Sequence, residues 1–449
     1  MNQIIPTLAV AAAALFSKGI GAQSFFEAIP TETTTEELDL DSPWTHRAWV
    51  QQKTGYGWHA PSLPASRDKA ALTRTETHLF GEIAWRKNAW RLQASGSIVQ
   101  GWLPDLEDAG VYSRYTFTTE QHQQRRWHLE MADTFVSWQN DDWWIKAGYQ
   151  TLAWGESESL KVTDVLARRD QRWPGQEDLE KLRLPVPAVQ ITWGKQLDLV
   201  TIINPLPDRM PAAGDEFDPY ADLGQQQPNI AIVEHSDNRP GVALRYRQQW
   251  QGLDTQWILA DVASYETELE TVSAGEKGPV AYVAPWRQQV AGASAQWVSG
   301  SWLVRTEQAL HFNTKVASAD PVAPWQDTRQ WRGMLGADYN GINDLVLTAE
   351  YSWLYVDNWH SGLAGERYQP AASGRASYTL LNEQLTLEAY AQAVTGGEGS
   401  VMRLMVEWQF SDRFSAAVTA IEYNGDHPED LLYPYRHNDT LLLNLRWGL

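Results

Sequence analysis

Several residues have the chemical types that acyl transfer would need, but their spacing does not complete a catalytic site. A nucleophilic serine needs a histidine in reach. The stretch Gly155-Glu156-Ser157-Glu158-Ser159 departs from the G-x-S-x-G pattern at its last position. The 10 histidines are scattered through the chain and show no His-x-x-x-His metal spacing. We therefore predict that the protein is not an enzyme and carries no cofactor.

Two acidic clusters could bind a divalent cation through carboxylate oxygens. The first comprises Asp215, Glu216, Asp218 and Asp222. The second, which could bridge lipopolysaccharide through divalent ions, comprises Asp426, Glu429 and Asp430. The first lacks the loop spacing and the glycine of an EF-hand, so a solvated loop is the favoured interpretation of both clusters. We predict no metal site.

Composition excludes several other classes of protein. The chain contains no cysteine, so disulfides, thiolate chemistry and cysteine zinc sites are excluded. Its formal charge of −20 disfavours nucleic acid as a partner. Mean hydropathy is −0.44, yet 11% of residues are aromatic and 24 are tryptophan. Beyond the N-terminus, no apolar run approaches the roughly 20 residues of a spanning helix. Many aromatic residues at low mean hydropathy are typical of a transmembrane β-barrel, in which alternate residues face a polar interior.

Alternation of apolar and polar residues is the main evidence for that fold. In the segment 345–353, Leu345, Leu347, Ala349, Tyr351 and Trp353 share one face of the expected strand. Segments 385–393, 402–410 and 414–420 repeat this pattern, and the final segment 440–449 continues it to the end of the sequence. The sequence therefore predicts an all-β fold, a transmembrane antiparallel barrel of about 14 to 16 strands with an irregular inserted loop.

Charged residues in the middle of these strands distinguish a barrel from a soluble sandwich or propeller. We expect them to face a wet lumen, because a packed core would not accept unpaired charges. The lumen-facing residues predicted in this way are Glu350, Arg403, Glu407 and Arg446. Aromatic residues collect at strand ends, as they do in the girdles of outer-membrane barrels, and no repeat of fixed period indicates a propeller.

The N-terminal part predicts export followed by a segment outside the barrel. Residues 1–22 resemble a secretory signal peptide, with an apolar core at 8–16 and small residues at Gly21-Ala22 before Gln23. Residues 23–75 are acidic and then rich in proline and glycine, which indicates a periplasmic segment. The barrel is expected over 76–449, with an insert at about 155–187.

The expected insert does not alternate, and it contains most of the candidate site residues. A run of this kind cannot lie in lipid, because its unpaired backbone groups would each cost several kcal/mol. It is either a constriction folded into the lumen or a long external loop. The residues that could bind a ligand or form a gate are Trp154, Gly155, Glu156, Ser157, Trp173, Pro174, Gly175, Glu177, Leu184 and Pro185. Trp154 to Ser157 could instead be a strand end where Gly155 permits a bend and Glu156 pairs with an interior arginine.

The same stretch resembles a known family. The motifs are GYQTLAWGES at 148–157, WPGQE at 173–177, LPVP at 184–187, NP at 204–205 and FDPY at 217–220. In this order they resemble a domain-of-unknown-function barrel family of Gram-negative outer membranes, whose members are often encoded beside exporters of the resistance-nodulation-division (RND) superfamily. The resemblance implies a location in the bacterial outer membrane. The partners it implies are outer-membrane lipid, lipopolysaccharide, the barrel assembly machinery and an RND-type exporter.

These observations lead to one favoured function and two alternatives. We expect an outer-membrane channel or export component that passes a hydrophobic or amphiphilic solute together with an RND-type exporter. A structural or adhesion scaffold with a closed lumen is the first alternative. A lipid-modifying enzyme of the outer membrane is the less favoured one.

Overall fold

A computed structural model of the chain describes residues 42–59, 71–108, 125–157, 160–177, 179–211, 215–218, 231–234, 237, 239–275, 278–318, 325–393, 399–427 and 430–449. The expected signal peptide at 1–22 lies outside the described residues, as does most of the expected periplasmic segment at 23–75. Within the described ranges, no helix is long and apolar enough to cross a membrane.

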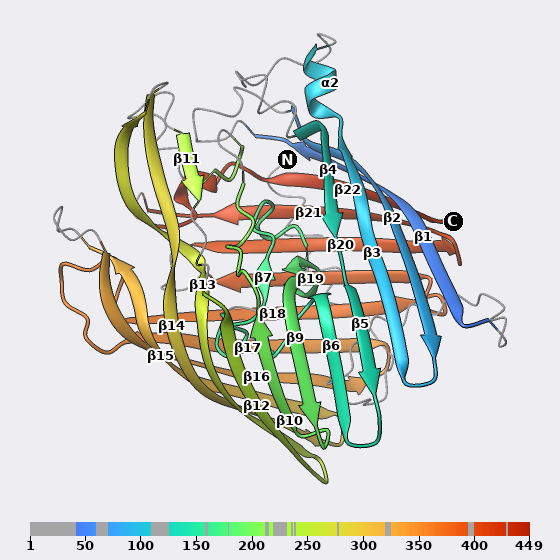
Figure 1. Cartoon of the computed structure of the whole chain (residues 1–449). Helices are drawn as coiled ribbons and strands as arrows, with labels where there is room; N and C mark the ends of the chain where they lie inside the picture. Colours follow the sequence, from blue (N-terminus) through green and yellow to red (C-terminus); the bar gives the residue numbers. More distant parts are fainter. Residues whose placement is uncertain are drawn as a thin grey trace.

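Among the described residues, eighteen antiparallel strands form one closed transmembrane barrel, which confirms the predicted fold (Figure 1). The final strand pairs with the first and closes the wall. In order around the wall, the strands are β1 (Trp44–Gly57), β2 (Ala71–Lys87), β3 (Trp90–Gly101), β4 (Trp127–Met131) with β5 (Thr134–Gln139), β6 (Trp143–Gln150), β9 (Val186–Trp193), β10 (Leu197–Ile202), β12 (Gly241–Trp250), β13 (Leu253–Gly275), β14 (Gly278–Ser299), β15 (Trp302–Ala317), β16 (Trp325–Ile342), β17 (Leu345–Val356), β18 (Tyr368–Leu380), β19 (Leu385–Ala393), β20 (Ser400–Ser411), β21 (Phe414–Asn424) and β22 (Thr440–Gly448).

The strand count and the start of the barrel differ from the expectation. Eighteen strands exceed the expected 14 to 16 because some strands do not alternate cleanly. β4 and β5 together occupy one position, both pair with β3, and they are interrupted at Ala132-Asp133. β9 contains Pro187, and β10 has only 6 residues. β1 lies within the segment expected to be periplasmic, so the barrel begins at Trp44 and not at residue 76.

The remaining elements are short. They are α2 (Leu103–Asp108), α4 (Leu179–Leu182), a 3₁₀ turn at Tyr433–Tyr435, and a two-stranded sheet of β7 (Arg168–Arg169) with β8 (Arg183–Leu184). β11 (Ala231–Glu234) pairs parallel with the part of β14 at 280–283. We use the name insert for residues 151–185, which leave the wall at the end of β6 and return at the start of β9, close to the expected bounds of 155–187.

The connections separate the two rims of the barrel. Short turns close one rim, for example residues 88–89 between β2 and β3 and residues 251–252 between β12 and β13. Long connections, including the insert, leave from the other rim (Figure 1). The first residues of β1 and the last residues of β22 lie at the short-turn rim, because Trp44 pairs with Trp85 and Trp49 pairs with Gly448.

The two faces of the wall differ as a membrane requires. The outward face is apolar, and exposed indoles collect near the short-turn rim. These are Trp44, Trp90, Trp143, Trp193, Trp250, Trp297, Trp302, Trp408 and Trp447. On the opposite face, Glu350 and Arg403 are only 3% and 5% exposed. Glu407 follows Arg403 at an even spacing on the same face of β20. The Arg446 guanidinium lies 4.8 Å from the ring centroid of Trp49 on β1.

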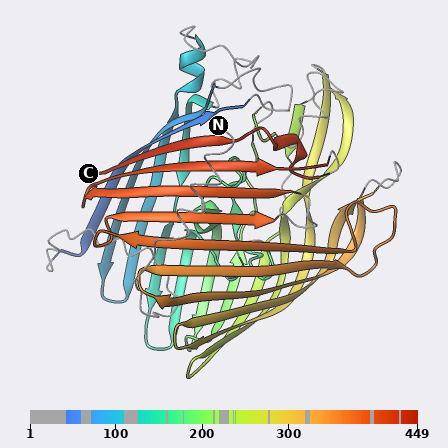
Figure 2. The same ribbon diagram turned by 180° about the vertical axis from the view of Figure 1, so that it is seen from behind.

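The insert packs against the inner side of the wall. Its residues Leu152, Trp154, Val162 and Leu166 form one buried cluster with barrel residues that include Ile258 and Met334. Figures 1 and 2 show the insert, with β7, enclosed by the strands in views from opposite sides. Of the two sequence interpretations, the structure therefore supports a loop folded against the interior.

Candidate functional site: an insert fixed to two sides of the lumen

The first arm of the insert, which we define as residues 152–166, begins with a buried tryptophan. Trp154 is 3% exposed, and the guanidinium of Arg245 on β12 lies 4.6 Å from its ring centroid. The Trp154 carbonyl accepts a hydrogen bond of 2.8 Å from Nε2 of Gln256 on β13. Both the ring and the backbone of this residue are therefore held by adjacent strands.

A single buried carboxylate on β15 holds most of the first arm. Glu307 is 0% exposed and accepts hydrogen bonds from the backbone N–H groups of Glu156, Ser157 (3.1 Å) and Thr163 (3.0 Å). Thr163 also donates its hydroxyl to Glu307 at 2.7 Å. The Ser157 hydroxyl donates to Glu350 on β17 at 2.8 Å. Two of the residues predicted from sequence, Ser157 and Glu350, thus meet. Glu307 satisfies backbone N–H groups that would otherwise be buried without partners, and Glu350 satisfies a buried hydroxyl.

Gly155 allows the first arm to approach the following turn closely. A Cβ at this position would lie 2.6 Å from the Asp164 Cβ and 2.7 Å from the Asp164 backbone nitrogen. Asp164 pairs with Arg169 at 3.0 Å and with Arg183 at 3.2 Å. Burial alone would raise the pKa of Asp164, but Arg183 and Arg169 outweigh burial and lower it. Arg183 also donates to the Gly155 carbonyl at 3.1 Å, which ties the arm to the end of the insert.

The Glu156 side chain is a second, largely buried acid of the first arm. Burial and then the nearby Glu307 carboxylate raise the pKa of Glu156 to about 7. Its carbonyl accepts a hydrogen bond of 3.0 Å from Nη1 of Arg305 on β15. The arm therefore contains a group that changes charge near neutral pH.

The second arm, residues 173–177, contacts the other side of the barrel. The Tyr423 hydroxyl on β21 donates to the Pro174 carbonyl, and the Arg74 guanidinium on β2 lies 4.8 Å from the Trp173 ring centroid. Gly175 adopts a φ of +73°, and a Cβ there would lie 2.8 Å from Cγ1 of Val401 on β20. In strand order, these contacts are about half a turn of the barrel from β12 to β17, which hold the first arm.

Ion pairs complete the attachment of the second arm. Glu177 pairs with Lys53 on β1 at 2.5 Å and with Arg74 at 3.5 Å. Burial alone would raise the pKa of Glu177, but Lys53 and Arg74 outweigh burial and lower it. Leu184 and Pro185 belong to neither arm. Leu184 pairs with Arg168 in the β7–β8 sheet, and Pro185 precedes β9 where the chain returns to the wall.

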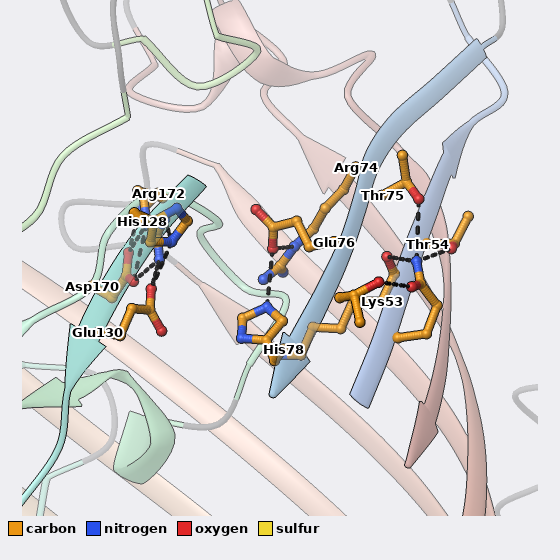
Figure 3. Close-up of polar contacts among 12 residues, drawn as sticks. Lys53, Thr54, Arg74, Thr75, Glu76, His78, His128, Glu130, Asp170 and Arg172 are labelled. Carbon is orange, nitrogen blue, oxygen red and sulfur yellow. Dashed lines mark hydrogen bonds and ion pairs between the residues drawn. The ribbon is translucent and has the colours of Figure 1, made fainter. Parts of the chain in front are cut away.

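Charged residues between the arms were missed from the sequence, and Figure 3 shows them. Arg172 of the insert pairs with Asp170 at 2.6 Å and with Glu130 of β4 at 2.8 Å. Two strands carry an acid and a histidine two residues apart, and these are Glu76 with His78 on β2 (3.4 Å) and Glu130 with His128 on β4 (3.0 Å). The spacing of two places each pair on one face of a strand. The spacing of each acid and histidine can be seen in the sequence, but the contact of Glu130 on β4 with Arg172 cannot.

The acidic clusters considered for cation binding make other contacts. Asp215 pairs with Arg125 at 2.9 Å. The Asp430 carboxylate accepts hydrogen bonds from the backbone N–H groups of Asp426 (2.8 Å) and His427 (2.9 Å). Asp222 and Glu429 lie outside the described residues. Within the part of the chain that the structure describes, no group of three or more His, Asp or Glu residues is placed to hold a metal ion.

A comparison with protein families identifies a family that matches most of the chain. The family model described as "Protein of unknown function (DUF1302)" matches residues 65–447. The chain belongs to the DUF1302 family. This finding confirms the family resemblance seen in the motifs around the insert. No curated protein matches the chain.

Solved structures share the fold of this DUF1302 barrel. The chain is similar to OccAB3 of Acinetobacter baumannii, with 9% identity, a TM-score of 0.50, and coverage of 90% of this chain and 99% of the other. OccK9 (OpdG) of Pseudomonas aeruginosa gives 10% identity, a TM-score of 0.50, and coverage of 90% and 97%. A BenF-like porin from Pseudomonas fluorescens Pf-5 gives 12% identity, a TM-score of 0.50, and coverage of 90% and 98%. At these identities the likeness concerns the fold alone.

The hydrogen bonds of Ser157 in the DUF1302 insert place its hydroxyl between the wall and the insert. The Ser157 hydroxyl donates to a carboxylate and accepts a hydrogen bond from the Leu160 backbone nitrogen at 3.2 Å. These partners differ from the histidine that activates a catalytic serine. What the arrangement provides is a segment held at two sides of a lumen, with ion pairs between the two attachments.

Proposed function

We propose that this protein is a channel of the bacterial outer membrane whose insert controls the passage of an amphiphilic solute. The observation that carries the proposal is the attachment of one insert to two opposite sides of the lumen, through Glu307 on β15 and through Lys53 and Arg74 on β1 and β2. A solute that crosses the barrel has to pass beside this segment or displace it.

The lining of the lumen supports an amphiphilic solute. Two partly exposed indole rings carry an arginine guanidinium over their faces, at 4.8 Å for both Trp173 and Trp49. An aromatic face beside a cation offers contacts to an apolar body and to an anionic group of the same molecule. The porin and channel folds of the structural neighbours support transport as the general class.

The arrangement of the rims supports an orientation in the membrane. Barrels of the outer membrane have short turns on the periplasmic side and long loops outside. On that basis the termini of the barrel lie in the periplasm, and the insert enters from the outside. Export in partnership with an RND-type exporter stays a prediction from the family resemblance, and co-purification after crosslinking in cells tests it.

Single-channel recording in planar bilayers tests the proposed function. Deletion of Lys161 to Lys181 removes the second arm, the end of the first arm and the residues between them, and we expect a higher conductance than that of the wild-type protein. The change in gel mobility on boiling, which intact barrels show, controls for assembly. An assembled deletion variant with unchanged conductance would refute control by the insert. If both proteins fail to conduct, the closed scaffold becomes the better account.

A further inference from the structure

The lipid-facing side of the wall has a depression at β2, β3, β5 and β6. Its volume is about 400 Å³, and its lining includes Trp44, Ile83, Trp85, Leu92, Ala94 and Ala147. Ile83 and Leu92 are 49% and 44% exposed, so their side chains lie on the outer surface of the barrel. The depression is therefore separate from the lumen and from the insert.

The order of side-chain sizes across the strands produces this depression. Strand register places Trp85, Leu92, Val136 and Ala147 in one row on adjacent strands, so that the side chains become smaller from β2 to β6. Trp44 pairs with Trp85, and their ring centroids are 6.4 Å apart, which forms a high aromatic edge on one side. Ala94, which pairs with Ile83, and Ala147 leave the floor low.

The position of the depression decides what can occupy it. It lies within the apolar outer face, so it is continuous with the interface between the barrel and the hydrocarbon of the membrane. A volume of about 400 Å³ falls within the range of roughly 300 to 1,000 Å³ that small-molecule sites in proteins occupy. An apolar site of this size that opens only to hydrocarbon fits an acyl chain.

The charges beside the depression indicate the headgroup. Lys87 follows Trp85 by two residues, so it lies on the same outward face, and it is exposed where β2 turns into β3 at the short-turn rim. Arg86 is also exposed at this end of β2. The turn between β5 and β6 carries the acids Asp141 and Asp142 instead, which confines the cationic position to the β2–β3 turn. An anionic headgroup gains about 1 kcal/mol from each basic residue near the membrane surface.

We propose that this surface is a binding site for an anionic phospholipid in the leaflet at the short-turn rim. One acyl chain lies over Ala94 and Ala147 against the Trp44–Trp85 edge, and the phosphate contacts Lys87. The site is independent of whether the barrel conducts, because it lies on the other side of the wall from the insert.

Native mass spectrometry of the detergent-purified full chain tests the site, with phosphatidylglycerol and phosphatidylethanolamine as the added lipids. We expect one phosphatidylglycerol to bind more tightly than the other copies and more tightly than phosphatidylethanolamine. Ala94→Trp fills the floor and should remove this binding. Ala349→Trp, at an exposed outward position on β17, is the matched control and should preserve it.

Lys87→Gln tests the headgroup separately from the groove. Loss of one charge should reduce the preference for phosphatidylglycerol over phosphatidylethanolamine about fivefold. Binding that survives Ala94→Trp in an assembled barrel, or that Ala349→Trp removes equally, would overturn the site. An unchanged lipid preference in Lys87→Gln would overturn the assignment of the phosphate to Lys87.

Discussion

Replacement of Glu307 by alanine should release the first arm of the insert without dissolving the barrel. The carboxylate accepts hydrogen bonds from the backbone N–H groups of Glu156, Ser157 and Thr163 and from the Thr163 hydroxyl. In Glu307→Ala these donors lose their acceptor together. The wall strands keep their own backbone ladder, because β15 pairs with β14 and β16 through main-chain groups that the substitution leaves in place.

The expected size of the effect follows from the number of donors. A buried donor that loses its partner costs about 1 to 3 kcal/mol. For three backbone donors the attachment of the arm is weakened by roughly 3 to 9 kcal/mol if all of them stay buried. Because about 1.4 kcal/mol changes an equilibrium tenfold, even the lower figure shifts the balance between attached and released arm by more than a hundredfold. Release lets water satisfy the donors.

Single-channel recordings report this release as frequent or longer openings. We expect Glu307→Ala to approach the conductance of the Lys161 to Lys181 deletion. Glu307→Gln, which keeps one side-chain oxygen as an acceptor, should give an intermediate record. A Glu307→Ala protein that assembles normally and conducts as the wild type does would refute the idea that this carboxylate holds the insert closed.

Three further predictions concern the other attachments of the insert. The pKa of Glu156 is raised to about 7, so the contribution of its carboxyl to attachment of the insert is complete below its ordinary pKa of 4.5 and is lost as pH rises through about 7. Channel openings should therefore be more frequent at pH 8 than at pH 5. A pH difference that persists in Glu156→Gln would contradict this assignment. Gly155→Ala should loosen the first arm, since its Cβ would lie 2.6 Å from that of Asp164, and hydrogen exchange of the insert should then be faster while the wall is unaffected. Glu177→Gln leaves Lys53 without its charged partner and should speed tryptic cleavage within the insert. The double variant Lys53→Gln with Glu177→Gln should recover part of the protection. Equal cleavage of the single and the double variant would argue against this ion pair.

The sequence predicted the wall best where one face meets lipid and the other meets polar groups. In β17, Leu347 and Tyr351 are exposed on the outer face and Glu350 is buried on the inner face, which is the alternation that the residues display. β1 escaped prediction because its outward face carries Gln52 and Thr54 at the far end, where Gln52 bonds to Thr75. Polar residues on both faces remove the period-two signal even though the strand is fully paired.

The insert was predictable as a segment, but its contacts were not. The cost of unpaired backbone in lipid places residues 157–184 away from the hydrocarbon whatever their detailed structure. The Ser157 backbone meets Glu307 across 150 positions of sequence, and Lys53 meets Glu177 across 124. No local pattern carries information about such distant pairs, because they depend on the number of strands and on the register of each one.

A reversible crosslink between the insert and the wall tests control of passage most directly. The chain has no cysteine, so Gly175→Cys with Val401→Cys introduces a single pair, at a position where a Cβ on residue 175 would lie 2.8 Å from Cγ1 of Val401. A non-glycine residue at the Gly175 φ of +73° costs about 1 to 2 kcal/mol, so Gly175→Cys alone is the control for strain.

The measurement is the conductance of single crosslinked channels before and after a reductant is added to the bilayer chamber. We expect few or no openings in the oxidised protein, and openings like those of the Gly175→Cys control once the disulfide is reduced. Equal conductance in both states, with the crosslink verified by mass spectrometry, would contradict the claim that movement of the insert controls passage through the barrel.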